Sequence, residues 1–179
     1  MNGKQLKNSI LQWAIQGKLV PQDPNDEPAS VLLERIRAEK ARLVKEKKIK
    51  KDKNESIIYR GEDNSYYEKF LATREVKCID EEIPFEIPAT WEWCRLLSIV
   101  SLLGDGIHGT PEYSEGGSVY FINGNNLFDG QILIKPDTKT VSKEEAVKHS
   151  RLLNESTVLV SINGTIGNIA FYSGENVIL

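Results

Sequence analysis

The stretch from Pro28 to Lys53 most constrains the fold, because its apolar residues recur at the three- and four-residue spacing of one helix face. Charged residues fill the positions between them, so the spacing predicts an amphipathic helix with one face to bury. The six lysines among residues 45–53 would repel one another in a regular helix, and we expect the helix to fray there. The apolar stripe consists of Ala29, Leu32, Leu33, Ile36, Leu43 and Val44.

A second apolar seam on residues 4–17 predicts a shorter helix that ends at Gly17. A proline-containing loop follows, so we expect the two helices to form a hairpin over residues 1–55. Because the second helix is the longer one, part of its stripe is expected to contact a partner chain or a later segment. The candidate residues for that contact are Leu32, Ile36 and Leu43.

Composition places the chain among globular proteins, since 40% of its 179 residues are apolar. No apolar run approaches the ~20 residues of a membrane helix, and the N-terminus lacks a secretory pattern, so we expect a cytoplasmic location. Cys78 and Cys94 form no CxxC pair and are interpreted as free thiols. No disulfide and no zinc or other metal site is predicted.

The formal charge is distributed unevenly along the chain. Residues 1–55 carry 13 Lys and Arg against 8 Asp and Glu, a net charge of +5, whereas residues 56–179 carry 10 against 18, a net charge of -8. Proteins that bind nucleic acids usually carry the opposite overall sign. The acidic part of the chain therefore argues against tight DNA binding by this protein alone.

Residues 56–82 lack a clear periodicity and are interpreted as a connector, with a short helix near Tyr66–Ala72. The prolines and tryptophans after Ile83 predict extended backbone and a domain boundary near Glu82. Residues 83–179 then form a domain of short strands separated by glycine and asparagine, which we expect to be incomplete at its C-terminal end. The expected strands are 119–122, 131–134, 157–162, 168–172 and 176–179.

A capping box, with Ser142 as cap and Glu145 three residues later, predicts a short helix within that domain. The predicted fold class is therefore α+β, with an N-terminal hairpin of long helices followed by a mixed α/β domain of short twisted strands.

The glycines at 104, 106 and 109 spell GxGxxG, but Thr110-Pro111 and a later glycine pair exclude the helix that a dinucleotide site requires. We interpret this segment as a loop, either a plain surface connection or a contact surface for DNA. Its candidate DNA-binding residues are His108, Thr110, Tyr113 and Ser114.

The segment Asn123-Gly-Asn-Asn126 directly follows an expected strand. Side-chain amides can bond both hydrogen-bonding positions of adenine in the major groove, so Asn123, Asn125 and Asn126 are candidate DNA-binding residues. The alternative is a hairpin turn, for which Asn-Gly is a common signal. The later segment Asn163–Gly167 is interpreted as a structural turn between two strands.

Catalytic motifs are absent from the sequence. His108 and His149 form no HExxH pair, no serine is flanked by the glycines of a nucleophile elbow, and no glycine-rich cofactor loop or methyltransferase motif occurs. We therefore predict a non-catalytic protein that needs no cofactor.

Long segments resemble the specificity subunits of type I restriction-modification enzymes. Residues 6–36, which include Leu-Gln-Trp-Ala-Ile-Gln-Gly-Lys-Leu-Val-Pro, are similar to the family's helical spacer. The segments that resemble its target recognition domain are Ile87-Pro-Ala-Thr-Trp-Glu-Trp-Cys-Arg-Leu, Gly109-Thr-Pro and Val158-Leu-Val-Ser-Ile-Asn-Gly-Thr-Ile-Gly.

The resemblance implies a non-catalytic subunit that reads one half of a bipartite target in double-stranded DNA. It implies methyltransferase subunits and translocase-nuclease subunits as partners, and a homodimer formed through the helices. If the methyltransferase subunits supply most of the phosphate-binding charge, the protein alone should bind DNA weakly and in a salt-sensitive way. Two alternatives stay open, namely a protein-protein interaction module without DNA readout and an enzyme with an unrecognised site.

Overall fold

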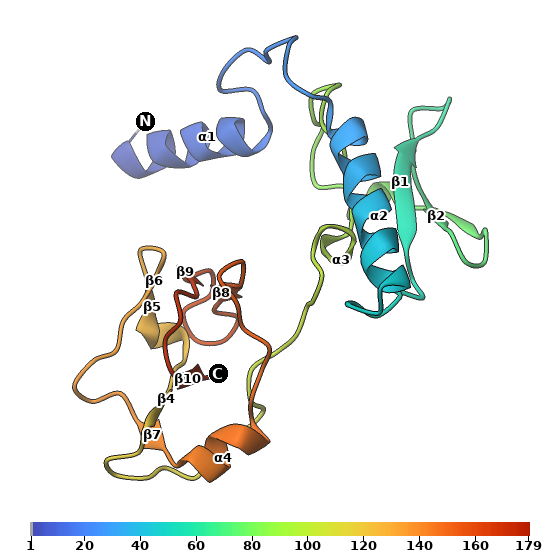
Figure 1. Ribbon diagram of the computed structural model, residues 1–179. Coiled ribbons are helices and arrows are strands. Elements are labelled where there is room, and N and C mark those ends of the chain that lie inside the picture. The colour runs from blue at the N-terminus through green and yellow to red at the C-terminus, as the bar shows by residue number, and fades with distance from the viewer. Residues whose placement is uncertain (1) are drawn as a thin grey trace. The chain divides into compact units, whose positions relative to one another are not determined.

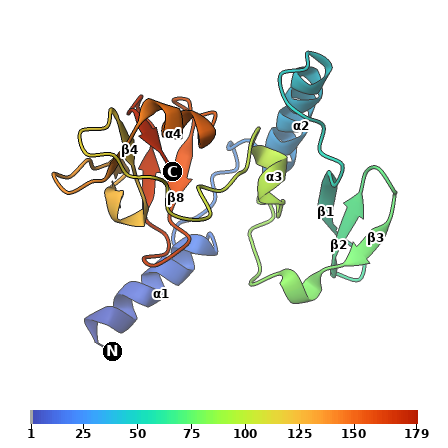
Figure 2. The same cartoon turned by 90° about the horizontal axis from the view of Figure 1, so that it is seen from below.

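The computed structural model describes residues 2–179, which form a mixed α/β chain with four α-helices and several small sheets (Figures 1 and 2). The chain divides into two compact units, one ending at Leu103 and the other running from Gly104 to Leu179. This division falls later than the domain boundary expected near Glu82. Hydrogen bonds explain the difference, since Ala29 N donates to Thr90 O at 2.9 Å and Arg95 Nε donates to Glu68 Oε1 at 3.0 Å within the first unit.

Helix α1 spans Gly3–Ile15 and begins with a capping box. Gln5 N donates to the Asn2 side chain at 2.9 Å, and Asn2 N donates to the Gln5 side chain at 2.8 Å. The helix ends before Gly17, whose φ of 67° is accessible to glycine, and a Cβ there would lie 2.6 Å from Pro88 Cγ. The predicted helix over residues 4–17 is thus confirmed in type and nearly in extent.

Helix α2 spans Ala29–Lys45. It is shorter than the predicted Pro28–Lys53 helix and ends where the lysine-rich stretch begins, as the expected repulsion suggested. With 17 residues it exceeds the 13 residues of α1 by only 4, less than the sequence indicated. Pro28 stands just before the first turn, where its missing N–H costs no helix hydrogen bond.

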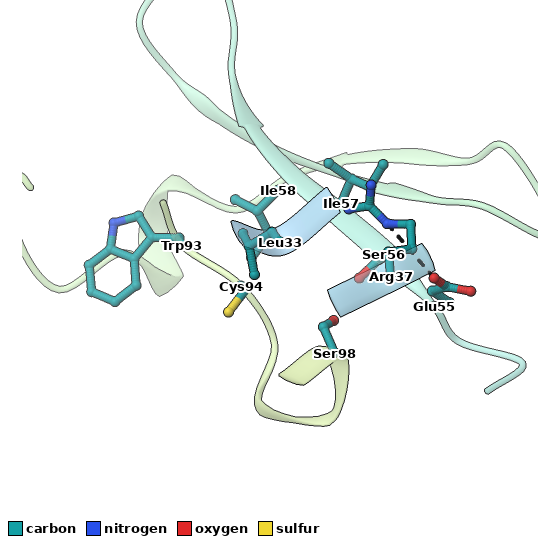
Figure 3. A pocket seen from close by; sticks show the side chains of 9 residues that line it. All are labelled: Leu33, Arg37, Glu55, Ser56, Ile57, Ile58, Trp93, Cys94 and Ser98. Carbon is teal, nitrogen blue, oxygen red and sulfur yellow. Dashed lines mark ion pairs between the residues drawn. The ribbon is translucent and has the colours of Figure 1, made fainter. Parts of the chain in front are cut away.

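The hairpin of α1 and α2 is not confirmed. Helix α2 instead packs beside α3 (Leu96–Ile99) and strand β1 (Ser56–Arg60), which enclose a small pocket with it (Figure 3). Lys40 Nζ donates to the carbonyls of Leu97 and Ser98 at 2.5 and 3.3 Å, so this ammonium group caps the C-terminal end of α3.

The expected connector carries an antiparallel sheet in the order β1-β2-β3, with β2 at Tyr66–Phe70 and β3 at Val76–Cys78. The short helix expected near Tyr66–Ala72 was wrong. The residues of β2 alternate between the two faces of the sheet, which buries Tyr66 and Glu68 and exposes Lys69. After β3, Ile79 is almost fully buried and a short 3₁₀ turn covers Asp80–Glu82.

A buried carboxylate joins this sheet to the segment before α3. Glu68 accepts hydrogen bonds from Ser56 Oγ at 2.5 Å and from Arg95 Nε and Nη2 at 3.0 and 2.5 Å. Arg95 also contacts Glu82 at 2.8 Å. The Arg95 guanidinium lowers the pKa of Glu68 below its usual value, against the opposing effect of burial.

The second unit contains three small sheets and one α-helix. Strand β4 lies between β10, which runs parallel to it, and the antiparallel β7, while β5 pairs with β6 and β8 with β9. The five runs predicted as strands all contain one. The bounds are β4 Val119–Phe121, β5 Leu127–Phe128, β6 Gln131–Ile132, β7 Thr140–Val141, β8 Val158–Val160, β9 Ile169–Phe171 and β10 Val177–Ile178.

Helix α4 covers Lys143–Lys148, which confirms the predicted short helix. Only half of the predicted capping box forms, since Ser142 accepts the Glu145 N–H at 3.1 Å but the Glu145 carboxylate bonds Glu112, Lys148 and His149. Within the second unit, α4 and β7 lie at one end and the β5–β6 and β8–β9 hairpins at the other (Figure 1). Two apolar clusters form its core. One comprises Ile122, Leu127, Ile132, Leu159 and Ala170, and the other Val119, Val141 and Ile178.

Among residues 2–179, none of the helices has the length and apolar character needed to cross a membrane. Cys78 and Cys94 are free thiols, in agreement with the sequence-based interpretation.

Candidate nucleic-acid interface

The loop from His108 to Ser114 is held at both ends by backbone contacts. Ile107 N donates to Leu179 O at 2.6 Å just before the loop, and Ser114 N donates to Thr140 O at 2.8 Å at its end. Tyr113 forms an isolated bridge with Val141. As predicted, no helix follows Gly106, so the glycine pattern does not build a dinucleotide site.

The four candidate side chains of this loop differ in accessibility. The His108 side chain is 85% exposed, and its Nε2 lies 3.3 Å from Asp105 Oδ2. Thr110 is exposed and Ser114 half-buried, and neither hydroxyl forms a hydrogen bond within residues 2–179. Tyr113 is 48% exposed, with its ring centroid 6.0 Å from that of Phe121. The loop thus presents several polar groups to solvent from an anchored backbone.

Glu145 of α4 fixes the middle of the loop, a role that the sequence did not indicate beyond its place in the capping box. Its buried carboxylate accepts the Glu112 N–H at 3.1 Å and bonds from Lys148 Nζ at 2.8 Å and His149 Nε2 at 3.2 Å. The Lys148 ammonium and the Glu112 N–H lower the pKa of Glu145 to about 2. The carboxylate therefore stays ionised at neutral pH and holds the loop as a charged acceptor.

The segment Asn123–Asn126 forms a one-turn 3₁₀ helix, η2 (Gly124–Asn126), with Asn123 as its cap. Asn126 is buried, and its amide nitrogen donates to Leu133 O at 2.9 Å and Thr138 Oγ1 at 3.1 Å. Its oxygen accepts Asn123 N–H at 3.1 Å. The amide of Asn126 is therefore occupied by the fold, which does not suit the DNA-contacting role assigned from the sequence.

Asn123 and Asn125 are exposed at the same turn. The Asn123 oxygen accepts the Asn125 N–H at 2.9 Å, which leaves its amide nitrogen free of hydrogen bonds within the described residues. The Asn125 side chain makes no hydrogen bond within residues 2–179, and its backbone carbonyl accepts one from Lys135 Nζ at 2.8 Å. These two amides are thus available to an external ligand.

The turn at Asn163–Gly167 lies beside this one. Asn168 Nδ2 donates to Gly124 O at 3.1 Å, and a Cβ on Gly124 would lie 2.9 Å from Ser161 Cβ. Asn163 and Thr165 are both exposed. From the sequence, this turn was expected to be only a structural connection between two strands. Its alignment with η2 depends on a contact between residues 44 positions apart, which a local pattern does not reveal. The structure thus adds two polar residues to the surface around Asn123 and Asn125.

The candidates therefore form two groups, the loop from His108 to Ser114 and the paired turns around Asn123 and Asn163. Within residues 2–179, no hydrogen bond joins one group to the other. Across the same residues, no three His, Cys, Asp or Glu side chains are arranged to hold a metal ion.

The three candidates for helix-mediated contact differ in accessibility. Leu32 is 40% exposed, whereas Ile36 and Leu43 are half-buried. Neither α1 nor α2 has a buried residue, but the apolar seam of α1 is more exposed than Ile36 and Leu43 of α2. In that seam Leu6 is 51%, Ile10 41% and Trp13 56% exposed.

Comparison with known proteins supports the resemblance noted in the sequence. Over 163 residues, or 91% of its length, the chain is 39% identical to the type I restriction enzyme EcoAI specificity subunit of Escherichia coli. It is 34% identical over 161 residues, or 89% of its length, to the EcoEI specificity subunit of the same organism.

The matched region covers 24% of each relative, so the chain spans about a quarter of their length. No family model and no solved structure matches the chain. Both relatives nevertheless match this chain along about nine-tenths of its length. The chain is therefore a homologue of the specificity subunits of type I restriction enzymes.

Proposed function

We propose that this protein recognises DNA as a non-catalytic specificity component of a type I restriction-modification system, reading one half of a bipartite target. The observation that carries the proposal is the 39% identity to a type I specificity subunit over 91% of the chain. The exposed polar groups of the second unit support it, because sequence is read by hydrogen bonds to base edges. In this proposal, residues 83–179 act as the target recognition domain and residues 1–55 as the spacer.

The reading residues that we propose are those with accessible polar groups. They are His108, Thr110, Tyr113 and Ser114 on the loop, and Asn123 and Asn125 at the turn. Asn126 is left out, because its amide is consumed by internal hydrogen bonds. Asn163 and Thr165 are added, since their turn is bonded to that of Asn125.

We further propose that the protein acts in a complex with adenine methyltransferase subunits, and through them with translocase-nuclease subunits. The exposed seam of α1 supports helix-mediated docking, since accessible apolar patches mark interaction sites. The same seam is the proposed contact if two copies pair through their helices. The part of the α2 stripe near Leu32 adds a smaller accessible area.

The experiment that tests the proposal is co-expression with a type I methyltransferase subunit, followed by selection of bound duplexes from a randomised DNA pool. We expect co-purification and enrichment of one short sequence. Asn125→Ala should reduce discrimination at one position by about 1–3 kcal/mol. Gln131→Ala, which removes an exposed amide on β6, is the matched control.

Two results would contradict the proposal. Co-purification without any enriched sequence would favour a protein-protein interaction module. Equal loss of binding to every sequence in Asn125→Ala would show that this residue contacts the backbone and not a base.

A further inference from the structure

A tight turn at the end of α2 folds the lysine-rich stretch back on the helix. Lys48 N donates to Leu43 O at 2.9 Å, and Lys47 N donates to Val44 O at 3.0 Å, which is the Schellman pattern. Lys47 occupies the left-handed position of this motif with φ 58°. The turn reverses the chain, so that Lys50 and Lys51 return beside the last turns of α2.

The returning segment and the helix enclose a groove in the first unit. Ala41 and Val44 contribute its apolar wall, and five cationic side chains line it together with Asp52 and Glu55. The cationic residues are Arg37, Lys40, Lys45, Lys50 and Lys51. The groove is therefore cationic on balance.

Most of this positive charge is not compensated within the protein. Glu55 lies 3.8 Å from Arg37, and Lys40 Nζ is directed to the carbonyls at the end of α3. Asp52 accepts the Asn54 N–H at 2.8 Å. Within residues 2–179, no carboxylate lies within ion-pair distance of Lys45, Lys50 or Lys51, nor of the neighbouring Lys47 and Lys53. These five lysines carry unpaired charge on one short stretch.

The opposite situation holds in the second unit. Residues 104–179 contain 5 Lys and Arg against 9 Asp and Glu, a net charge of -4. The unit that carries the proposed reading residues thus repels the DNA backbone, and phosphate affinity within this chain must come from elsewhere. Residues 1–55, with their net charge of +5, contain the groove.

We propose that the groove between α2 and residues 50–52 binds backbone phosphates of double-stranded DNA and adds sequence-independent affinity. The inference rests on the proposed function and names a second kind of DNA contact within it. Lysines are compact charges on flexible stems, which suit phosphates without fixing one geometry. An acidic protein partner is the alternative that the experiment must separate from DNA.

The test measures the binding of the whole chain to a fluorescent duplex across a series of salt concentrations. The variant Lys45→Gln/Lys50→Gln/Lys51→Gln removes three unpaired charges from the groove. Each lost phosphate contact reduces the slope of log K against log salt by about 0.9, so we expect a decrease of about 2–3 and at least tenfold weaker binding near 0.1 M salt.

The matched control is Lys4→Gln/Lys7→Gln/Lys18→Gln, which removes the same charge from exposed positions of the first unit outside the groove. It should leave the slope nearly unchanged. If the first variant loses helix content, Lys50→Gln/Lys51→Gln lies wholly outside α2 and should still reduce the slope by about 2.

The outcomes separate this inference from the proposed function. Equal slopes for groove and control variants, or no binding by the unmodified chain at low salt, would overturn the phosphate site even if the complex with methyltransferase selects a sequence. Loss of methyltransferase binding with an unchanged slope would overturn it in favour of an acidic protein partner. A lower slope together with no sequence preference in the complex would support the site and reject the reading role.

Discussion

The two units of this protein are stabilised in different ways. Within residues 2–103, only two apolar side chains are buried, Tyr66 and Ile79, and the unit depends on Glu68, which bonds Ser56 and Arg95. The second unit has eight buried apolar residues in two clusters. Its strands are only two or three residues long, so packing of their inward side chains has to replace long hydrogen-bonded ladders.

The two units are therefore sensitive to different substitutions. A network of charges loses stability when a carboxylate is neutralised, whereas an apolar core loses it when volume is removed. All three tryptophans, Trp13, Trp91 and Trp93, belong to the first unit. Tryptophan fluorescence therefore follows that unit alone, and amide hydrogen exchange is needed to follow the other.

The largest effect is expected for Leu159→Ala, which truncates the buried β8 residue of the larger cluster. We expect a loss of about 3 kcal/mol in the free energy of unfolding of the second unit. Hydrogen exchange in β8 and β9 should accelerate, while the tryptophan transition stays unchanged. Val158→Ala, on the opposite face of the same strand and 50% exposed, should cost only about 0.5 kcal/mol. Equal effects of the two substitutions would contradict the assignment of the core.

Glu68→Gln tests the charge network of the first unit. The substitution removes the negative charge and replaces one acceptor oxygen by an amide NH2 group that faces Arg95, which should cost about 2 kcal/mol, measured by denaturation followed through tryptophan fluorescence. The exposed Glu81→Gln is the control.

Glu68→Gln should also change how the stability of the first unit depends on pH. Because the folded-state pKa of Glu68 is lowered, its stabilising effect is complete above the ordinary value of 4.5 and disappears as pH falls below that value toward the lowered pKa. Glu68→Gln should therefore weaken the acid sensitivity of the first unit. An unchanged pH profile would show that other carboxylates dominate it.

Lys47→Gly tests the turn that forms the lysine-rich groove. Glycine adopts the left-handed conformation without the penalty of a side chain, so the first unit should gain about 1 kcal/mol, seen as a higher midpoint of the tryptophan transition. Lys48→Gly, one residue later and outside the left-handed region, should instead lower stability by about 0.5 kcal/mol. A gain in both variants would point to relief of lysine repulsion and not to backbone strain.

Glu145→Gln should have the smallest and most local effect, because it weakens the anchor of the loop without creating a cavity. We expect faster hydrogen exchange at the Glu112 amide and little change in β8 and β9. Since the pKa of Glu145 is about 2, the anchor should persist as pH falls below 4.5 and be lost only near pH 2. Glu144→Gln, its exposed neighbour, is the control, and an equal response there would refute the anchor.

The sequence by itself determined the elements that depend on neighbouring residues. Helical spacing marked α1 and α2, Ser142 marked the start of α4, and β-branched runs between glycines marked five of the strands. The fraying expected over residues 45–53 also agrees with the end of α2 at Lys45. Each of these signals operates within a few residues of chain.

Only the tertiary structure decided which groups face each other. The packing of α2 against α3 joins residues as far apart as Lys40 and Leu97, which are separated by 57 positions. The β1-β2-β3 sheet joins strands that are neighbours in sequence, but their residues lack a clear strand pattern. The burial of Asn126 follows from its internal bonds to Leu133 and Thr138. The hydrogen bond from the Glu112 N–H to Glu145 joins residues 33 positions apart, and the bond that aligns the turns at Asn123 and Asn163 joins residues 44 positions apart. The physical reason is that a buried polar group requires a specific hydrogen-bond partner, and local spacing carries no information on which distant residue provides it.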